Sequence, residues 1–69
     1  METLELWIGG EPKQFEAPLT LSQLLSKLSL AGRRIAVELN GEIVPRSRFD
    51  GIMLESGDKL EIVTAVGGG

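Results

Sequence analysis

The chain has 69 residues and a net charge of −3, and it contains neither cysteine nor histidine. A chain of this length folds as one small domain with little room for a catalytic cavity, because ligand pockets typically occupy about 300–1,000 Å³. The absence of cysteine and histidine excludes thiol nucleophiles and thiolate or imidazole metal ligands. The negative net charge argues against nucleic acid as a partner.

The chain shows no membrane or export signal. No stretch approaches the ~18–20 apolar residues of a membrane span, and the start of the chain is acidic rather than basic. We therefore expect no membrane partner and a cytoplasmic location.

Residues 2–8 alternate with period two, which predicts a strand with Leu4, Leu6 and Ile8 on its buried face. The turn-forming residues 9–12 follow, and residues 13–17 are expected to return as a short antiparallel strand. Together they predict a hairpin.

A helix should begin at Thr20. Thr20 as N-cap and Gln23 three residues later form a capping box, and Leu19 and Leu24 hold the positions of a hydrophobic staple. Leucines at i, i+3, i+4 and i+7 then predict one buried stripe. They are Leu21, Leu24, Leu25 and Leu28. Gly32 is the expected end of the helix, because glycine adopts the left-handed conformation at low cost.

The second half of the chain predicts three strands. Residues 34–39 form the first, and Asn40-Gly41 indicates a tight turn into the short run 42–44, which ends at Pro45. Residues 46–58 are expected to be irregular, with turns at Asp50 and Asp58 rather than an acid–base set with Glu55. Residues 59–66 form the last strand.

This order predicts an α+β fold, a β-grasp, in which one helix packs on a mixed four- to five-stranded sheet. Residues 1–66 would form the domain, with the first and last strands adjacent at its centre. Gly67, Gly68 and Gly69 would form a flexible tail, because glycine accepts almost any backbone conformation. Three residues extend at most about 10 Å, enough to carry a terminal carboxylate into another protein's active site.

The whole chain resembles the ubiquitin-like superfamily, and more closely its bacterial thiamine-pathway sulfur carriers, the ThiS family. The resemblance rests on the segment Val37-Glu-Leu-Asn-Gly-Glu-Ile-Val-Pro-Arg46 and on the closing segment Ser56-Gly-Asp-Lys-Leu-Glu-Ile-Val-Thr-Ala-Val-Gly-Gly-Gly69. The family motif ends in two glycines and this chain in three, and we take Gly69 as the native terminus.

The resemblance implies a protein co-substrate rather than an enzyme, with no catalytic residue and no bound cofactor of its own. A ThiF-type adenylating enzyme would use ATP with Mg²⁺ to activate the carboxylate of Gly69. Sulfur from a persulfide, such as that of a cysteine desulfurase, would then give a thiocarboxylate for a ThiG-type thiazole synthase. Gly67 and Gly68 would serve as the tail.

Trp7 is the candidate docking residue, because the alternation places it on the face away from the helix. In a β-grasp we expect it beside Val63 and Ala65 of the last strand, so the three would form an apolar patch near the tail. The alternative is that Trp7 only covers the sheet. All four arginines lie within residues 33–48. We expect them to form either a solvated edge of the domain or a docking site for an acidic partner.

Other functions remain open at this point. The chain could be a MoaD-like carrier, a tRNA-thiolation carrier or a ubiquitin-like modifier. It could also be a β-grasp interaction module whose tail takes part in no reaction.

Overall fold

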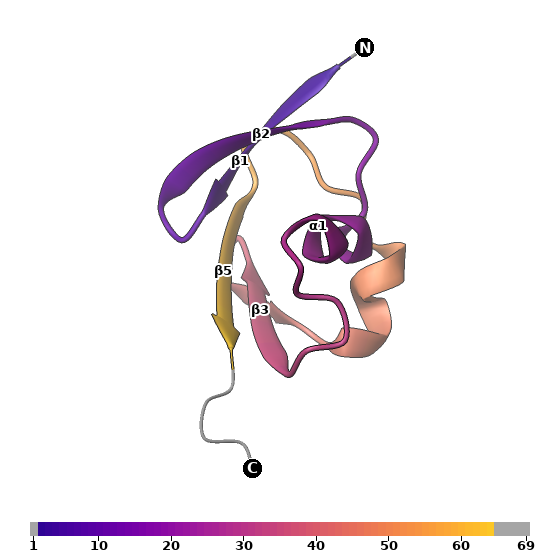
Figure 1. The fold of residues 1–69 in the computed structure, drawn as a ribbon. Helices are drawn as coiled ribbons and strands as arrows, with labels where there is room; N and C mark the ends of the chain where they lie inside the picture. Colours follow the sequence, from indigo (N-terminus) through magenta and orange to yellow (C-terminus); the bar gives the residue numbers. More distant parts are fainter. Residues whose placement is uncertain (1, 65–69) are drawn as a thin grey trace.

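The computed structural model describes residues 2–64, which form a five-stranded mixed sheet, an α-helix and a 3-10 helix (Figure 1). In chain order the elements are β1 (Thr3–Ile8), β2 (Glu11–Glu16), α1 (Leu21–Lys27), β3 (Ile35–Leu39), β4 (Glu42–Val44), the 3-10 helix η1 (Arg46–Gly51) and β5 (Lys59–Thr64). Helix α1 and η1 lie together on one side of the sheet (Figure 1).

The sheet has the strand order β2-β1-β5-β3-β4, so the first and last strands are neighbours at its centre. They run parallel, with Trp7 paired to Lys59 and Ile8 to Leu60, whereas the other neighbouring strands are antiparallel. This strand order, with α1 packed on one face of the sheet, confirms the predicted β-grasp.

The first hairpin is tighter than the sequence indicated. Gly9 and Gly10 alone form the turn, with φ of 59° and 86°, and β2 begins directly at Glu11. Pro12 therefore lies inside the strand, paired with Trp7, rather than in the turn. Proline is tolerated there because β2 is an edge strand, whose outer side needs no backbone donor.

The predicted start of α1 is confirmed, and its predicted end is wrong. The Thr20 hydroxyl accepts from the backbone N–H of Gln23 at 3.1 Å, and the Gln23 side chain accepts from the Thr20 N–H at 2.9 Å. The helix ends at Lys27, and Ser29 takes the left-handed conformation with φ of 61°. The N–H of Leu30 then bonds to the carbonyl of Leu25 at 2.7 Å, closing a Schellman motif before Gly32 is reached.

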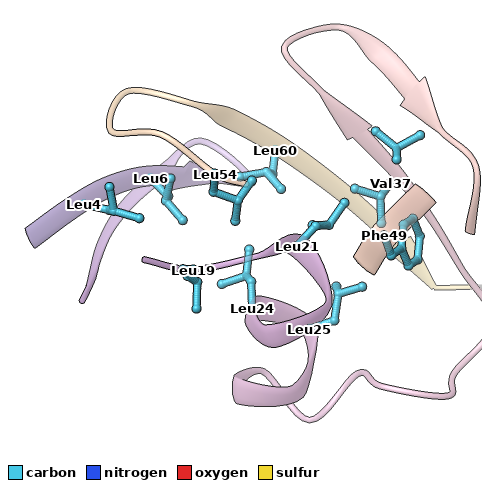
Figure 2. Close-up of a cluster of buried hydrophobic side chains, with 11 residues drawn as sticks. Leu4, Leu6, Leu19, Leu21, Leu24, Leu25, Val37, Phe49, Leu54 and Leu60 are labelled. Atoms are coloured by element: carbon cyan, nitrogen blue, oxygen red, sulfur yellow. The ribbon is translucent and has the colours of Figure 1, made fainter. Parts of the chain in front are cut away.

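The core lies between α1 and the sheet. Leu21, Leu24 and Leu25 are at most 3% exposed, whereas Leu28, at the end of the predicted stripe, is only partly buried. Figure 2 shows the helix leucines and the side chains of β1, β3 and β5 converging on one cluster. From the sheet come Leu4, Leu6, Val37, Val44 and Leu60.

Residues 46–51, expected to be irregular, instead form η1. Its Phe49 is 8% exposed and closes one end of the core beside α1. A 3-10 helix this short has too few turns to produce a readable pattern in the sequence. The following segment holds the start of α1 in place, because the carbonyl of Ile52 accepts from Leu21 and Leu54 donates to Leu19, each at 2.9 Å.

Candidate functional site

The candidate site is the end of β5, because the glycine tail follows this strand in the sequence. The last described residue of β5, Thr64, pairs with Ile35, and Val63 pairs with Ala36 on the neighbouring β3. Val63 is 64% exposed, so its side chain is free to contact another molecule. Ala65, Gly67, Gly68 and Gly69 lie outside the described residues.

The final half of β5 extends beyond its other neighbour. Pairing between β1 and β5 stops at Ile8 and Leu60, and one further bond joins the N–H of Gly9 to the carbonyl of Leu60 at 3.0 Å. Beyond Leu60, β5 pairs with β3 alone among the described strands. One edge of this half-strand therefore has no neighbouring strand in residues 2–64, at the place where the chain continues toward the glycines.

The expectation that Trp7 lies beside Val63 is wrong. Trp7 pairs with Lys59 at the start of β5 and with Pro12 of β2. Val63 lies four residues further along β5, which corresponds to about 13 Å at about 3.3 Å per residue. The parallel register causes this separation, because β1 ends where β5 begins. Trp7 is 36% exposed, and its docking role stays a prediction for a separate part of the sheet.

The structure brings together a group that the sequence did not predict. An open hollow of about 350 Å³ lies at the end of the β3–β5 pair. Its lining comprises Arg34, Ile35, Ala36, Arg46 and Val63. Arg46 reaches it from η1, and its Nη2 donates to the carbonyl of Arg33 at 2.5 Å. The clustering of arginines within residues 33–48 was the only sequence signal for this site.

Asp58 holds a turn, as the sequence predicted, whereas Asp50 lies in η1 rather than in a turn. The Ser22 hydroxyl donates to Asp50. Asp58 accepts from the side chain of Asn40 at 3.0 Å and from the backbone N–H of Glu55 at 2.8 Å. The first contact joins α1 to η1, and the contacts of Asp58 hold its own turn and connect it to Asn40.

Two kinds of feature are absent from the described residues, a metal-binding cluster and a membrane-spanning helix. Within residues 2–64, no three or more acidic side chains gather closely enough to hold a metal ion. No helix in the same range has the length and apolar character needed to cross a membrane.

The strand order, the parallel central pair and α1 on one face define a ubiquitin-like β-grasp domain, and in the sequence the three glycines follow two residues after β5. The sequence model of the ThiS family matches residues 6–69, which is nearly the whole chain. The chain belongs to the ThiS family.

Individual relatives agree with this assignment. The chain is 35% identical to a thiamine biosynthesis protein (ThiS) from Geobacter metallireducens, whose crystal structure superposes with a TM-score of 0.81 over 96% of this chain and 100% of that one. It is 41% identical to the protein ycf40 of Pyropia yezoensis, over 96% of this chain and 93% of the relative.

A third relative is much longer. A thiazole synthase of Paramagnetospirillum magneticum is 46% identical over 66 residues, which are 96% of this chain and 20% of the relative. The chain therefore spans about a fifth of the length of that protein.

Proposed function

We propose that this protein is a sulfur carrier for the formation of the thiamine thiazole, acting as a co-substrate rather than as an enzyme. The reacting group is the carboxyl of Gly69. A ThiF-type adenylating enzyme activates it and a thiazole synthase uses the product. The carrier needs no cofactor of its own, and we place the reaction in the cytoplasm.

The proposed chemistry has three steps, which take place at the α-phosphorus of ATP, at the carbonyl carbon of Gly69 and at the S–S bond that then forms. An oxygen of the Gly69 carboxylate attacks the α-phosphate of ATP, with Mg²⁺ held by the adenylating enzyme, and pyrophosphate leaves. A persulfide sulfur then attacks the acyl carbon and AMP leaves. A thiol cleaves the resulting S–S bond, which leaves the thiocarboxylate on Gly69 and a disulfide on the sulfur donor.

The observation that carries this proposal is the family match, which runs through the glycine tail to Gly69. The geometry of the site is consistent with it, because β5 extends past β1 toward the tail and Val63 is exposed. The glycines place no side chain near the acyl carbon. Holding that carbon in attack geometry inside a partner's active site contributes about 7–11 kcal/mol to catalysis.

The choice of thiazole synthase as acceptor has separate support. Two thiazole synthases, from Paramagnetospirillum magneticum and Magnetococcus marinus, each contain a region similar to 96% of this chain. In those proteins a ThiS-like region and the remainder of a thiazole synthase belong to one polypeptide. We infer that this chain, when separate, meets the same kind of enzyme.

The test is the intact mass of the protein after incubation with ATP, Mg²⁺, a sulfur donor and a ThiF-type enzyme. Conversion to the thiocarboxylate raises the mass by the difference between sulfur and oxygen. Oxidation of Met1 or Met53 gives nearly the same shift, so a thiol-alkylating reagent must be added. Since the chain has no cysteine, alkylation that maps to Gly69 identifies the thiocarboxylate.

Two controls sharpen this experiment. Omitting ATP should abolish alkylation, and peroxide-treated protein should show the mass shift without any alkylation. No alkylation of Gly69 in the complete reaction would overturn the proposal and favour an interaction module. Lysine-linked adducts in cells would indicate a ubiquitin-like modifier instead. Transfer of sulfur only to a molybdopterin or tRNA acceptor would indicate a carrier for that pathway.

A further inference from the structure

We propose that the hollow at the end of β5 is the docking surface for thiazole synthase and that it receives an acidic segment of that enzyme. This inference rests on the proposed function. We call this surface the exit patch, and define it by its lining residues, which are Arg34, Ile35, Ala36, Arg46 and Val63.

The position of the exit patch follows from the length of the tail. Five residues, 65–69, separate Thr64 from the proposed reacting carboxyl, and they span at most about 18 Å when fully extended. An enzyme that acts on Gly69 must therefore bring its own surface close to Thr64. Thr64 pairs with Ile35, and the preceding pair is Val63 with Ala36, so these lining residues are among the first surfaces that such an enzyme meets.

The charge of the exit patch selects the chemistry of its partner. The protein carries a net charge of −3, yet two arginines from separate elements, Arg34 before β3 and Arg46 in η1, line the same hollow. A guanidinium fork binds carboxylates with two parallel hydrogen bonds. The carbonyl of Arg33 accepts from Arg46, which directs this side chain across the gap between η1 and the start of β3.

The apolar part of the exit patch provides the contact area. Val63 is 64% exposed, and Ala36 beside it is also exposed. An interface with a small apolar centre and charged residues at its rim has the composition of many protein–protein contacts. We therefore expect the enzyme to present aspartate or glutamate next to an aliphatic side chain.

The test measures binding of the full-length protein to thiazole synthase by calorimetry, with matched substitutions. Arg34→Glu reverses a charge in the exit patch, and Arg48→Glu makes the same change on η1 beside β4, outside it. Val63→Ser removes an exposed aliphatic group, and Ile43→Ser does the same on β4, where Ile43 is 65% exposed. Thermal unfolding of each variant verifies that it is folded.

We expect Arg34→Glu to weaken binding about tenfold and Arg48→Glu to change it little, because only the first charge faces the enzyme. Val63→Ser should likewise weaken binding more than Ile43→Ser. Salt on the order of 1 M, where the Debye length is about 3 Å, should weaken binding of the unmodified protein to the enzyme more than it weakens binding of the Arg34→Glu variant.

Three results would overturn the inference, and they are distinguishable from failure of the proposed function. Equal effects of Arg34→Glu and Arg48→Glu on binding would show that the exit patch is not the docking surface. The proposed carrier role would be unaffected by that result. Binding that salt does not affect would exclude an acidic segment as the occupant. No binding of the unmodified protein would exclude thiazole synthase as the partner, and the alkylation of Gly69 would then decide independently whether the chain is a carrier.

Discussion

The side chain of Asn40 connects two turns that are 18 residues apart, because its Nδ2 donates to Asp58 Oδ1 at 3.0 Å. Its Oδ1 accepts from the backbone N–H of Lys59 at 2.9 Å, and its own N–H donates to the Lys59 carbonyl at 2.7 Å. These bonds anchor the first residue of β5, the strand that leads to the tail.

Asn40→Gly should separate the hydrogen bonds from the backbone geometry. Asn40 has φ of 51°, which asparagine tolerates better than serine and glycine adopts without strain, so the main effect of the substitution is the loss of the side-chain bonds. We expect the free energy of unfolding to fall by about 1 kcal/mol, which lowers the Tm by about 4–8 °C in a domain of this size. Calorimetric unfolding measures this, and an unchanged Tm would show that the network contributes nothing.

Ser29→Gly should stabilise the protein. Ser29 has φ of 61° at the end of α1, where a residue with a Cβ is strained and glycine is the usual choice. We expect a gain of about 0.5–1 kcal/mol, after allowing for the greater freedom of glycine in the unfolded chain. Denaturant unfolding measures the change.

The matched control for Ser29→Gly is Ser26→Gly. Ser26 lies within α1, where glycine costs about 0.5 kcal/mol relative to serine. Opposite signs for the two serines would confirm that the left-handed position, rather than glycine itself, causes the gain. Destabilisation by both would contradict the prediction.

Gly69→Val should abolish thiocarboxylate formation and leave the Tm unchanged, because a branched side chain next to the acyl carbon blocks attack. The control is Gly51→Val, since an added Cβ at Gly51 meets no atom within 4 Å and its φ is not positive. Gly51→Val should form the thiocarboxylate normally. Alkylation followed by mass spectrometry measures both, and normal conversion of Gly69→Val would refute the assigned role of Gly69.

Trp7→Ala tests the docking role predicted for that residue. Because Trp7 pairs with Lys59 at the far end of β5 from the tail, we expect its loss to weaken enzyme binding less than Val63→Ser does. Calorimetric binding measures this effect, and thermal unfolding measures the Tm. A clear fall in Tm with unchanged affinity would instead assign Trp7 to packing against Pro12 and Lys59.

Features with local physical causes could be predicted from the sequence. The capping box at Thr20 depends on residues three apart, and the Asn40-Gly41 turn depends on two residues that accept positive φ, here 51° and 87°. The period-two pattern of β1 placed Leu4 and Leu6 in the core. The predicted order of elements was sufficient for the β-grasp fold, and the segments 37–46 and 56–69 were sufficient for the family.

The tertiary structure alone decided how the functional surfaces are arranged. The parallel register of β1 on β5 separates Trp7 from Val63, and alternation within each strand carries no information about that register. The exit patch depends on η1 bringing Arg46 beside Arg34, twelve positions earlier in the chain. Sequence periodicity determines which face of an element is buried, whereas the packing of distant elements determines which exposed residues lie together.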